Sequence, residues 1–206
     1  MGVREGFPIA SCPISARPIY GIIFWITFAL WVLPEILFWK IKRSTDATKV
    51  RDKGSLDLIV ILFWAGIAAD FLISFLLPQT VISWKRTRVF ILGIFLMTTG
   101  IALRWYCILI LGKFFTFDIA IRSGQPLIET GPYRYVRHPS YTGALLTLAG
   151  FGLALGNWVG LAAILLSMGL AYSYRIPVEE AALTAALGDS YKEYASRTWR
   201  LVPFLF

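Results

Sequence analysis

Two clusters of polar side chains carry the groups that could do chemistry. The first is the stretch Gly131–Gly143, which holds two arginines, three tyrosines and the only histidine of the chain. The second is Arg175–Glu180, whose charged members are Arg175, Glu179 and Glu180. An out-and-back pair of membrane helices between the clusters would bring both to the same membrane face.

The second cluster has two interpretations. Arg175 and Glu179 are four residues apart, so they share a helix face if the helix continues through Pro177. They then form either a structural salt bridge, or a cation for a substrate carboxylate beside an anion for a cationic cofactor.

The first cluster also has a structural alternative. Arg137, His138 and Pro139 could be an interfacial anchor, with the neighbouring tyrosines Tyr133, Tyr135 and Tyr141 in an aromatic belt. A single histidine without partners makes no zinc site, and we expect no metal. The sequence contains neither a nucleophile elbow nor a dinucleotide-binding glycine pattern after a strand.

The composition predicts an integral membrane protein. Apolar residues make up 57% of the chain, its mean hydropathy is +0.67, and the apolar residues fall in long blocks. The net charge of +8 could indicate nucleic acid. Basic loops on the cytoplasmic side explain it better, so we expect membrane lipid and no nucleic acid as a partner.

The order of apolar runs predicts an all-α integral membrane protein with about five transmembrane helices, the last two forming a C-terminal helical hairpin. The polar segment Lys113–Arg137 contains glycines and prolines typical of an ordered loop. The predicted spans are Ile19–Trp39, Leu56–Leu77, Val89–Leu111, Pro139–Gly156 and Trp158–Tyr174, followed by helices over Val178–Leu187 and Ser190–Arg197.

The basic residues predict the orientation. One side, formed by Lys40–Ser55, Lys113–His138 and the segment from Arg175 onward, carries 14 of the 20 lysines and arginines, and the other side carries five. This bias places the N-terminus outside, and the C-terminus and both clusters in the cytoplasm.

Charged residues inside the runs are costly and suggest function. Arg104 lies about 10 Å and Glu35 about 6 Å from the cytoplasmic ends of their helices, while Asp70 lies deeper. Arg104 therefore matches Glu35 in depth better than Asp70. The two either form a structural pair, or Arg104 lines a pocket for an anionic lipid-like substrate.

The clusters, taken together, resemble the isoprenylcysteine carboxyl methyltransferase family. The resemblance covers roughly Leu127 to Phe206. It rests on Gly131-x-Tyr133, Arg137-His138-Pro139-Ser140-Tyr141-x-Gly143, Arg175-x-x-x-Glu179-Glu180-x-x-Leu183, Gly188-x-x-Tyr191-x-x-Tyr194 and Arg200-Leu201-x-Pro203-Phe204.

The resemblance implies a membrane enzyme that transfers a methyl group from S-adenosylmethionine to the carboxylate of a lipophilic substrate. Because several spans leave little of the 206 residues for a soluble domain, we expect one domain over residues 1–206. Three spans lie in 19–111, and the cofactor-binding catalytic region is expected in 112–206. Arg175 would hold the substrate carboxylate. The implied cofactor residues at the cytoplasmic face are Gln125, Pro126, Leu127, Ile128, Tyr133, His138, Pro139, Ser140, Tyr141 and Glu179.

Other functions stay open at this point. A phospholipid N-methyltransferase has an amine acceptor, which needs a proton acceptor rather than an arginine such as Arg175. A sterol-type reductase would need a longer chain. A transporter or other non-catalytic membrane protein would need a polar path across the bilayer, whereas the polar groups here gather at one face.

Overall fold

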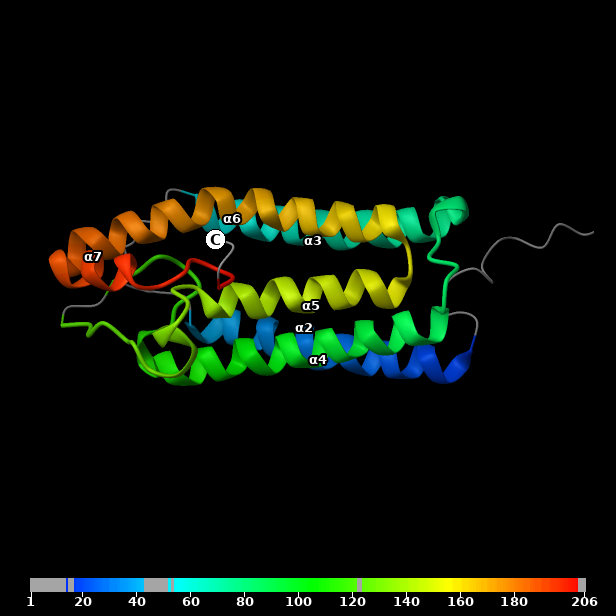
Figure 1. The fold of residues 1–206 in the computed structure, drawn as a ribbon, viewed down its shortest axis with the longest axis horizontal. Helices are drawn as coiled ribbons and strands as arrows, with labels where there is room; N and C mark the ends of the chain where they lie inside the picture. The colour runs from blue at the N-terminus through cyan, green and yellow to red at the C-terminus, as the bar shows by residue number, and fades with distance from the viewer. Residues whose placement is uncertain (1–13, 15–16, 43–51, 53, 122–123, 204–206) are drawn as a thin grey trace, which may run out of the picture.

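The protein is a bundle of helices that run back and forth along one axis (Figure 1). The computed structural model describes residues 14, 17–42, 52, 54–121 and 124–203. The α-helices are α2 (Pro18–Lys42), α3 (Ser55–Leu76), α4 (Arg86–Leu111), α5 (Pro139–Leu155), α6 (Trp158–Leu187) and α7 (Asp189–Ser196). Short 3₁₀ helices are η2 (Pro78–Thr80), η3 (Gly112–Phe114) and η4 (Gly131–Arg134).

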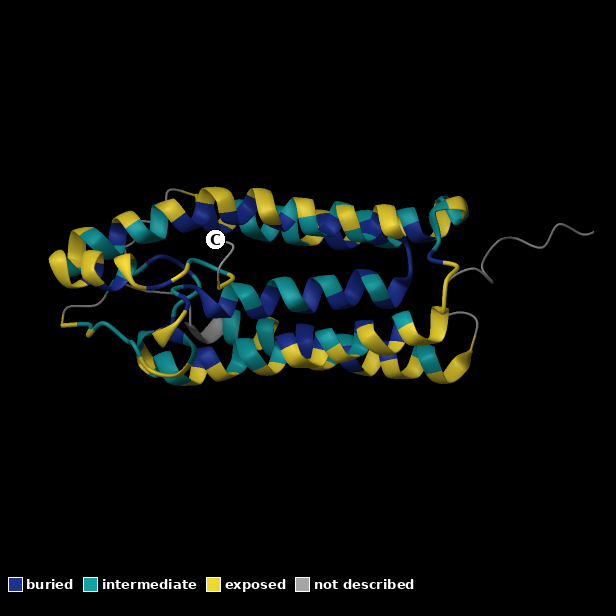
Figure 2. Ribbon diagram, viewed as in Figure 1, coloured by how far each residue is buried: buried dark blue, intermediate teal, exposed yellow. Residues whose placement is uncertain are grey.

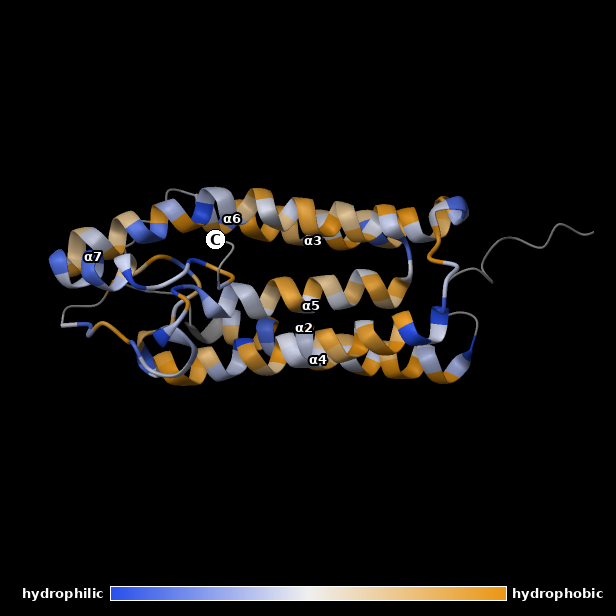
Figure 3. Ribbon diagram, in the orientation of Figure 1, coloured by the Kyte–Doolittle hydropathy of each residue, from blue (hydrophilic) through white to orange (hydrophobic). Residues whose placement is uncertain are grey.

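Four of these helices, α2, α3, α4 and α6, are long and apolar enough to cross a membrane. Helix α5 is also apolar but has 17 residues, about 26 Å at helical rise. Apolar residues cover most of the bundle, while hydrophilic residues gather at its two ends, at α7 and at the start of α4 (Figure 3). The chain is therefore a multi-pass membrane protein, and the predicted all-α membrane fold is confirmed, with four full-length spans and one shorter helix.

The shorter helix occupies the interior of the bundle. Helix α5 packs against α4 and α6, and α6 packs against α3. More of α5 is buried than of the other long helices (Figure 2). Because Gly100 and Gly143 face each other, α4 and α5 approach closely: a Cβ at Gly100 would lie 2.5 Å from the Gly143 carbonyl oxygen.

Helix α6 corrects one prediction. The sequence predicts separate helices over Trp158–Tyr174 and Val178–Leu187, whereas α6 is continuous and contains Pro177. A proline inside a helix removes one backbone donor and crowds the preceding turn. The packing of α6 against α3 and α5 offsets this local cost, so the helix carries Arg175 and Glu179 on a single rigid element.

The turn between α5 and α6 is tight because of its two residues. Gly156 has a left-handed backbone with φ of 77°, which suits glycine. The Asn157 side chain accepts hydrogen bonds from the backbone N–H groups of Val159 and Gly160, capping α6. Asn157 also donates to the Leu77 carbonyl at 3.2 Å, so this turn is tied to the end of α3.

The opposite end of the bundle is closed by the segment after α7. Backbone bonds join Arg137 N to Trp199 O at 2.7 Å and His138 N to Arg200 O at 3.0 Å. Trp199 N in turn donates to Tyr135 O at 3.0 Å. This pairing places the first predicted cluster beside the segment that follows α7. Phe204, the last residue of the motif pattern, lies outside the described residues.

Candidate active site

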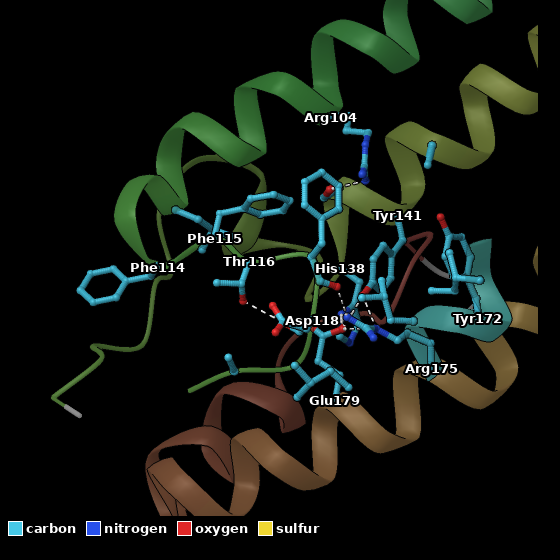
Figure 4. Close-up of a pocket in the computed structure, with 18 of the residues that line it drawn as sticks. Arg104, Phe114, Phe115, Thr116, Asp118, His138, Tyr141, Tyr172, Arg175 and Glu179 are labelled. Carbon is cyan, nitrogen blue, oxygen red and sulfur yellow. Dashed lines mark hydrogen bonds and ion pairs between the residues drawn. The ribbon is translucent and has the colours of Figure 1, made fainter. Parts of the chain in front are cut away.

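A cavity of about 530 Å³ lies where α7 and the loops meet the long helices. Its volume falls within the range of small-molecule sites in proteins. Figure 4 shows side chains from several elements converging on it. It is lined by the predicted site residues Arg104, Gln125, Pro126, Leu127, Ile128, Tyr133, His138, Ser140, Tyr141, Arg175 and Glu179. Pro139 is not part of this lining: it is buried as the first residue of α5.

Three stacked rings form one wall of the cavity. The His138 and Tyr141 rings are parallel within 5° at 5.4 Å, and Tyr141 stacks on Tyr172 at 4.6 Å. His138 precedes α5 and is only 5% exposed, and Tyr133 is 7% exposed. Residues this deeply buried do not fit an interfacial aromatic belt, so that interpretation of the first cluster is wrong for His138 and Tyr133.

The Tyr141 hydroxyl connects the two charges of the second cluster. It donates to Glu179 Oε2 at 2.6 Å and accepts from Arg175 Nε at 3.2 Å. Arg175 and Glu179 are also within 4.0 Å of each other, as their four-residue spacing predicts. A cation and an anion therefore face the cavity on either side of one phenol.

The neighbouring Glu180 has a different set of partners. It accepts from Arg137 Nε at 2.8 Å and Arg200 Nε at 3.2 Å, and it lies 3.4 Å from His138 Nε2. Arg137 also donates to the Ala195 carbonyl at 2.7 Å, at the end of α7. Glu180 is thus the centre of an ionic cluster that joins α6, α7 and the start of α5. Figure 4 shows His138, and Glu179 that precedes Glu180 in the chain, among the residues that line the cavity.

The intramembrane pair expected from helix depth is present. The Arg104 guanidinium binds both carboxylate oxygens of Glu35, with Nη2 3.0 Å from Oε2. Its Nη1 donates to Ser140 Oγ at 3.0 Å, which links α2, α4 and α5. Arg104 and Glu35 both line the cavity, so the pair is structural and also available to a ligand. Asp70, which the depth argument set aside, is fully buried beside Ser74.

The matches to known proteins fall on this part of the chain. Residues 91–185 match the isoprenylcysteine carboxyl methyltransferase (ICMT) family. The resemblance inferred from the sequence motifs is confirmed over residues 127–185, where the two ranges overlap.

Curated relatives carry the same family name. A protein-S-isoprenylcysteine O-methyltransferase of Schizosaccharomyces pombe is 34% identical over 96 residues, 46% of this chain and 41% of that protein. Protein-S-isoprenylcysteine O-methyltransferase B of Arabidopsis thaliana is 35% identical over 115 residues, 55% of this chain and 58% of that protein. The matched part therefore spans less than two thirds of the length of these relatives.

A solved structure has the same fold. The eukaryotic intramembrane Ras methyltransferase ICMT superposes with a TM-score of 0.57 at 26% sequence identity. The match covers 71% of this chain and 52% of the ICMT chain. The ICMT-like helical arrangement thus extends beyond the residues that the family profile matches.

Within this ICMT-like site, sequence reasoning missed the groups that hold Arg175. Asp52 and Ser55 bind Nη1 of Arg175, and the Phe117 carbonyl accepts from Nη2 at 2.6 Å. These residues lie 123, 120 and 58 positions from Arg175. No spacing rule connects positions so far apart, and only the fold brings them together.

The α7 tyrosines Tyr191 and Tyr194 were motif positions without assigned contacts, whereas the loop tyrosine Tyr133 was expected at the cofactor. The Tyr194 hydroxyl donates to the Tyr133 carbonyl at 2.6 Å, which fixes η4 against α7. Burial raises the pKa of the Tyr133 phenol, so it stays a neutral donor at physiological pH. Tyr191 lines the cavity, and its buried hydroxyl has no hydrogen-bond partner among the described residues.

Most of the remaining cavity wall is apolar, although Thr116 and Asp118 also line it. It continues from the charged groups between α2, α3, α5 and α6, where its lining includes Trp31, Phe63, Trp64, Leu148 and Met168. Within the described residues, no group of three or more histidine, cysteine, aspartate or glutamate side chains could hold a metal ion. The site therefore joins a small set of charges to an apolar chamber at membrane depth.

Proposed function

We propose that this protein is a carboxyl O-methyltransferase that uses S-adenosylmethionine and acts on a lipophilic carboxylic acid, such as an S-isoprenylcysteine. The observation that carries the proposal is the arrangement around Tyr141. Arg175 and Glu179 flank its hydroxyl in a cavity whose far wall is apolar. The match to the ICMT family over residues 91–185 supports the same reaction.

The cofactor is proposed for the part of the cavity nearest α7. S-adenosylmethionine would supply a methyl group activated by a positively charged sulfur. Glu179 offers a carboxylate to a cationic ligand, and His138 and Tyr141 offer stacked ring faces. The unpartnered Tyr191 hydroxyl at the same end fits a ligand rich in hydrogen-bonding groups. The backbone and side chains of Gln125–Ile128 would complete this wall.

Arg175 is proposed to hold the carboxylate of the acceptor. A carboxylate is already ionised at neutral pH, because model acids of this type have a pKa near 4, so the site needs no general base. The residues have to position the acceptor and exclude water, which can account for ~7–11 kcal/mol of a reaction barrier. The side chain of Arg175 is only 4% exposed, which suits a site that favours the loss of charge.

The apolar chamber is proposed to take the hydrocarbon part of the acceptor. Trp31, Phe63 and Met168 present a wall of aromatic and flexible apolar side chains. The Arg104–Glu35 pair lies on the cavity wall as well and would contact polar atoms of the acceptor. The whole chain would act as one domain whose active site faces the cytoplasm, with the N-terminus on the opposite side.

The test combines cofactor binding with turnover. Purified protein in detergent is titrated with S-adenosylhomocysteine by calorimetry, and methyl transfer to a small S-prenylcysteine is measured. We expect binding by the wild type and a loss of at least ~10-fold in affinity for Glu179→Ala, since charge-assisted hydrogen bonds are strong. Arg175→Ala should lower turnover by at least ~100-fold while keeping cofactor affinity.

Three outcomes would contradict the proposal. Folded wild-type protein that does not bind S-adenosylhomocysteine would exclude the cofactor. Equal losses of cofactor affinity and turnover in Arg175→Ala would remove the proposed role of that residue. Methyl transfer to an amine lipid but not to a carboxylic acid would make the protein a phospholipid N-methyltransferase.

A further inference from the structure

Arg175 is enclosed by parts of the chain that lie far from it in sequence. Nη1 donates to Asp52 Oδ1 and to Ser55 Oγ, the latter at 2.8 Å. Nη2 donates to the Phe117 carbonyl, and Nε donates to Tyr141. A guanidinium has five N–H groups, so these bonds use four of them. One N–H on Nη2 has no partner among the described residues.

Asp52 is itself held in place by α3. Its Oδ2 accepts from the Leu56 backbone N–H at 3.1 Å, and its Oδ1 accepts from the Ser55 hydroxyl. Ser55 is fully buried, and Asp52 is 9% exposed. Asp52 therefore caps the first turn of α3 while it binds Arg175. A carboxylate with three donors from two elements is a fixed anchor rather than a loosely held group that a ligand could displace.

We propose that Asp52 and Ser55 are positioning residues for the acceptor carboxylate, acting through Arg175. They fix the plane of the guanidinium, so that its remaining Nη2 N–H faces the acceptor in one orientation. This proposal rests on the proposed function, because it assumes that Arg175 binds a carboxylate. It adds a role for Asp52 and Ser55, to which the ICMT match over residues 91–185 does not extend.

The geometry predicts how the loss of Asp52 should affect each substrate. Without its charge partner, the Arg175 side chain can rotate, and the acceptor loses its orientation. The cofactor wall of His138 and Glu179 is built from α5 and α6 and keeps its contacts. Acceptor kinetics should therefore change much more than cofactor affinity.

The experiment compares Asp52→Asn with Asp57→Asn, which removes the same charge from an exposed position in the first turn of α3. We expect Asp52→Asn to lower kcat/KM for the acceptor by at least ~10-fold, as for other hydrogen bonds to charged groups. The Kd for S-adenosylhomocysteine should change by less than about threefold, well below the loss expected in kcat/KM. Asp57→Asn should match the wild type. Ser55→Ala removes one bond to Arg175 and should give a smaller loss of the same kind, which serves if Asp52→Asn does not fold.

A thermal-melting cycle separates this proposal from the proposed function. Asp52→Asn, Arg175→Gln and the double variant should show non-additive melting shifts, because the two side chains are in direct contact. Non-additive melting shifts would establish the ion pair between Asp52 and Arg175. If the wild type then transferred no methyl group, the proposed function would be refuted, and the positioning role with it. Unchanged or increased kcat/KM in Asp52→Asn, or equal losses of acceptor turnover and cofactor affinity, would overturn the positioning role alone.

Discussion

At the scale of single residues, the site depends on groups that touch two partners at once. The Tyr141 hydroxyl accepts from Arg175 and donates to Glu179, so its proton and lone pair both have assigned places. Arg104 divides its donors between Glu35 and Ser140 in the same way. Shared bonds of this kind leave few alternative side-chain arrangements, which favours a preorganised site.

Tyr191 provides a test of the cofactor site at this scale. Its hydroxyl is buried at the cavity without a partner among the described residues. If this hydroxyl bonds to the cofactor, Tyr191→Phe should weaken S-adenosylhomocysteine binding by about fivefold, the value of one neutral hydrogen bond of ~1 kcal/mol. Calorimetry measures the affinity, and thermal melting without ligand is the control. An unchanged affinity would place the cofactor away from Tyr191.

Sequence reasoning selected residues that meet in the structure where the signal was local or could be compared along helices. His138, Arg175 and Glu179 belong to short motifs, and helix depth was enough to pair Glu35 with Arg104. Asp52 could not be found in this way, because its contact with Arg175 spans 123 residues and depends on the packing of α3 beside α6. The roles of the motif residues in binding and catalysis remain predictions.

At the scale of elements, the close contact between α4 and α5 sets the shape of the site. A Cβ on Gly150 would lie 2.4 Å from the Gly93 carbonyl oxygen, and Gly100 and Gly143 are equally close. Small residues at such positions let membrane helices approach each other. Helix α5 begins at the wall of stacked rings that includes His138 and Tyr141, and α4 carries Arg104. The contact between α4 and α5 therefore holds the ring wall and Arg104 at a fixed distance.

Gly100 and Gly169 form a matched pair for testing this contact. Gly100→Ala places a methyl group against the backbone of α5 and should lower the free energy of unfolding by about 1–3 kcal/mol. Gly169 is exposed on α6, and a Cβ added there would have no neighbouring atom within 4 Å. Gly169→Ala should therefore be neutral or raise the free energy of unfolding by up to ~1 kcal/mol. Thermal melting in detergent measures both, and equal destabilisation of the two variants would refute the close α4–α5 contact.

The ends of the helices were harder to predict from the sequence than the presence of the helices. The apolar runs predicted α2, α3, α4 and α5 to within a few residues, since a membrane span needs about 20 apolar residues. Pro177 suggested a break that the tertiary packing of α6 overrides. The pairing of Arg137 with Trp199 was not predictable either, because two short segments 62 positions apart have no apolar periodicity in common.

At the scale of the whole molecule, the polar groups divide unequally between the two ends of the bundle. One end carries the Asn157 turn, and the other carries the cavity, α7 and the cluster around Glu180 (Figure 1). The positive-inside rule predicts that the second end faces the cytoplasm. This orientation would give the active site access to a water-soluble cofactor.

Cysteine labelling tests the orientation. In a Cys12→Ser background, Ser83→Cys and Ser190→Cys place thiols at exposed positions on opposite ends of the bundle. A reagent that cannot cross membranes should label Ser83→Cys in intact cells and Ser190→Cys only after permeabilisation. Cys107 is buried and should not react. The reverse pattern would place the cavity outside the cytoplasm.

The pairing of the segment after α7 with residues 135–138 also sets an order for biosynthesis. Trp199 and Arg200 supply backbone acceptors for Arg137 and His138, and Leu201 accepts from the Thr142 hydroxyl. Every described spanning helix precedes these residues in the chain. The segment that closes the cavity is therefore synthesised after each of these helices, so the cavity can close around a ligand only when the whole described bundle has been made.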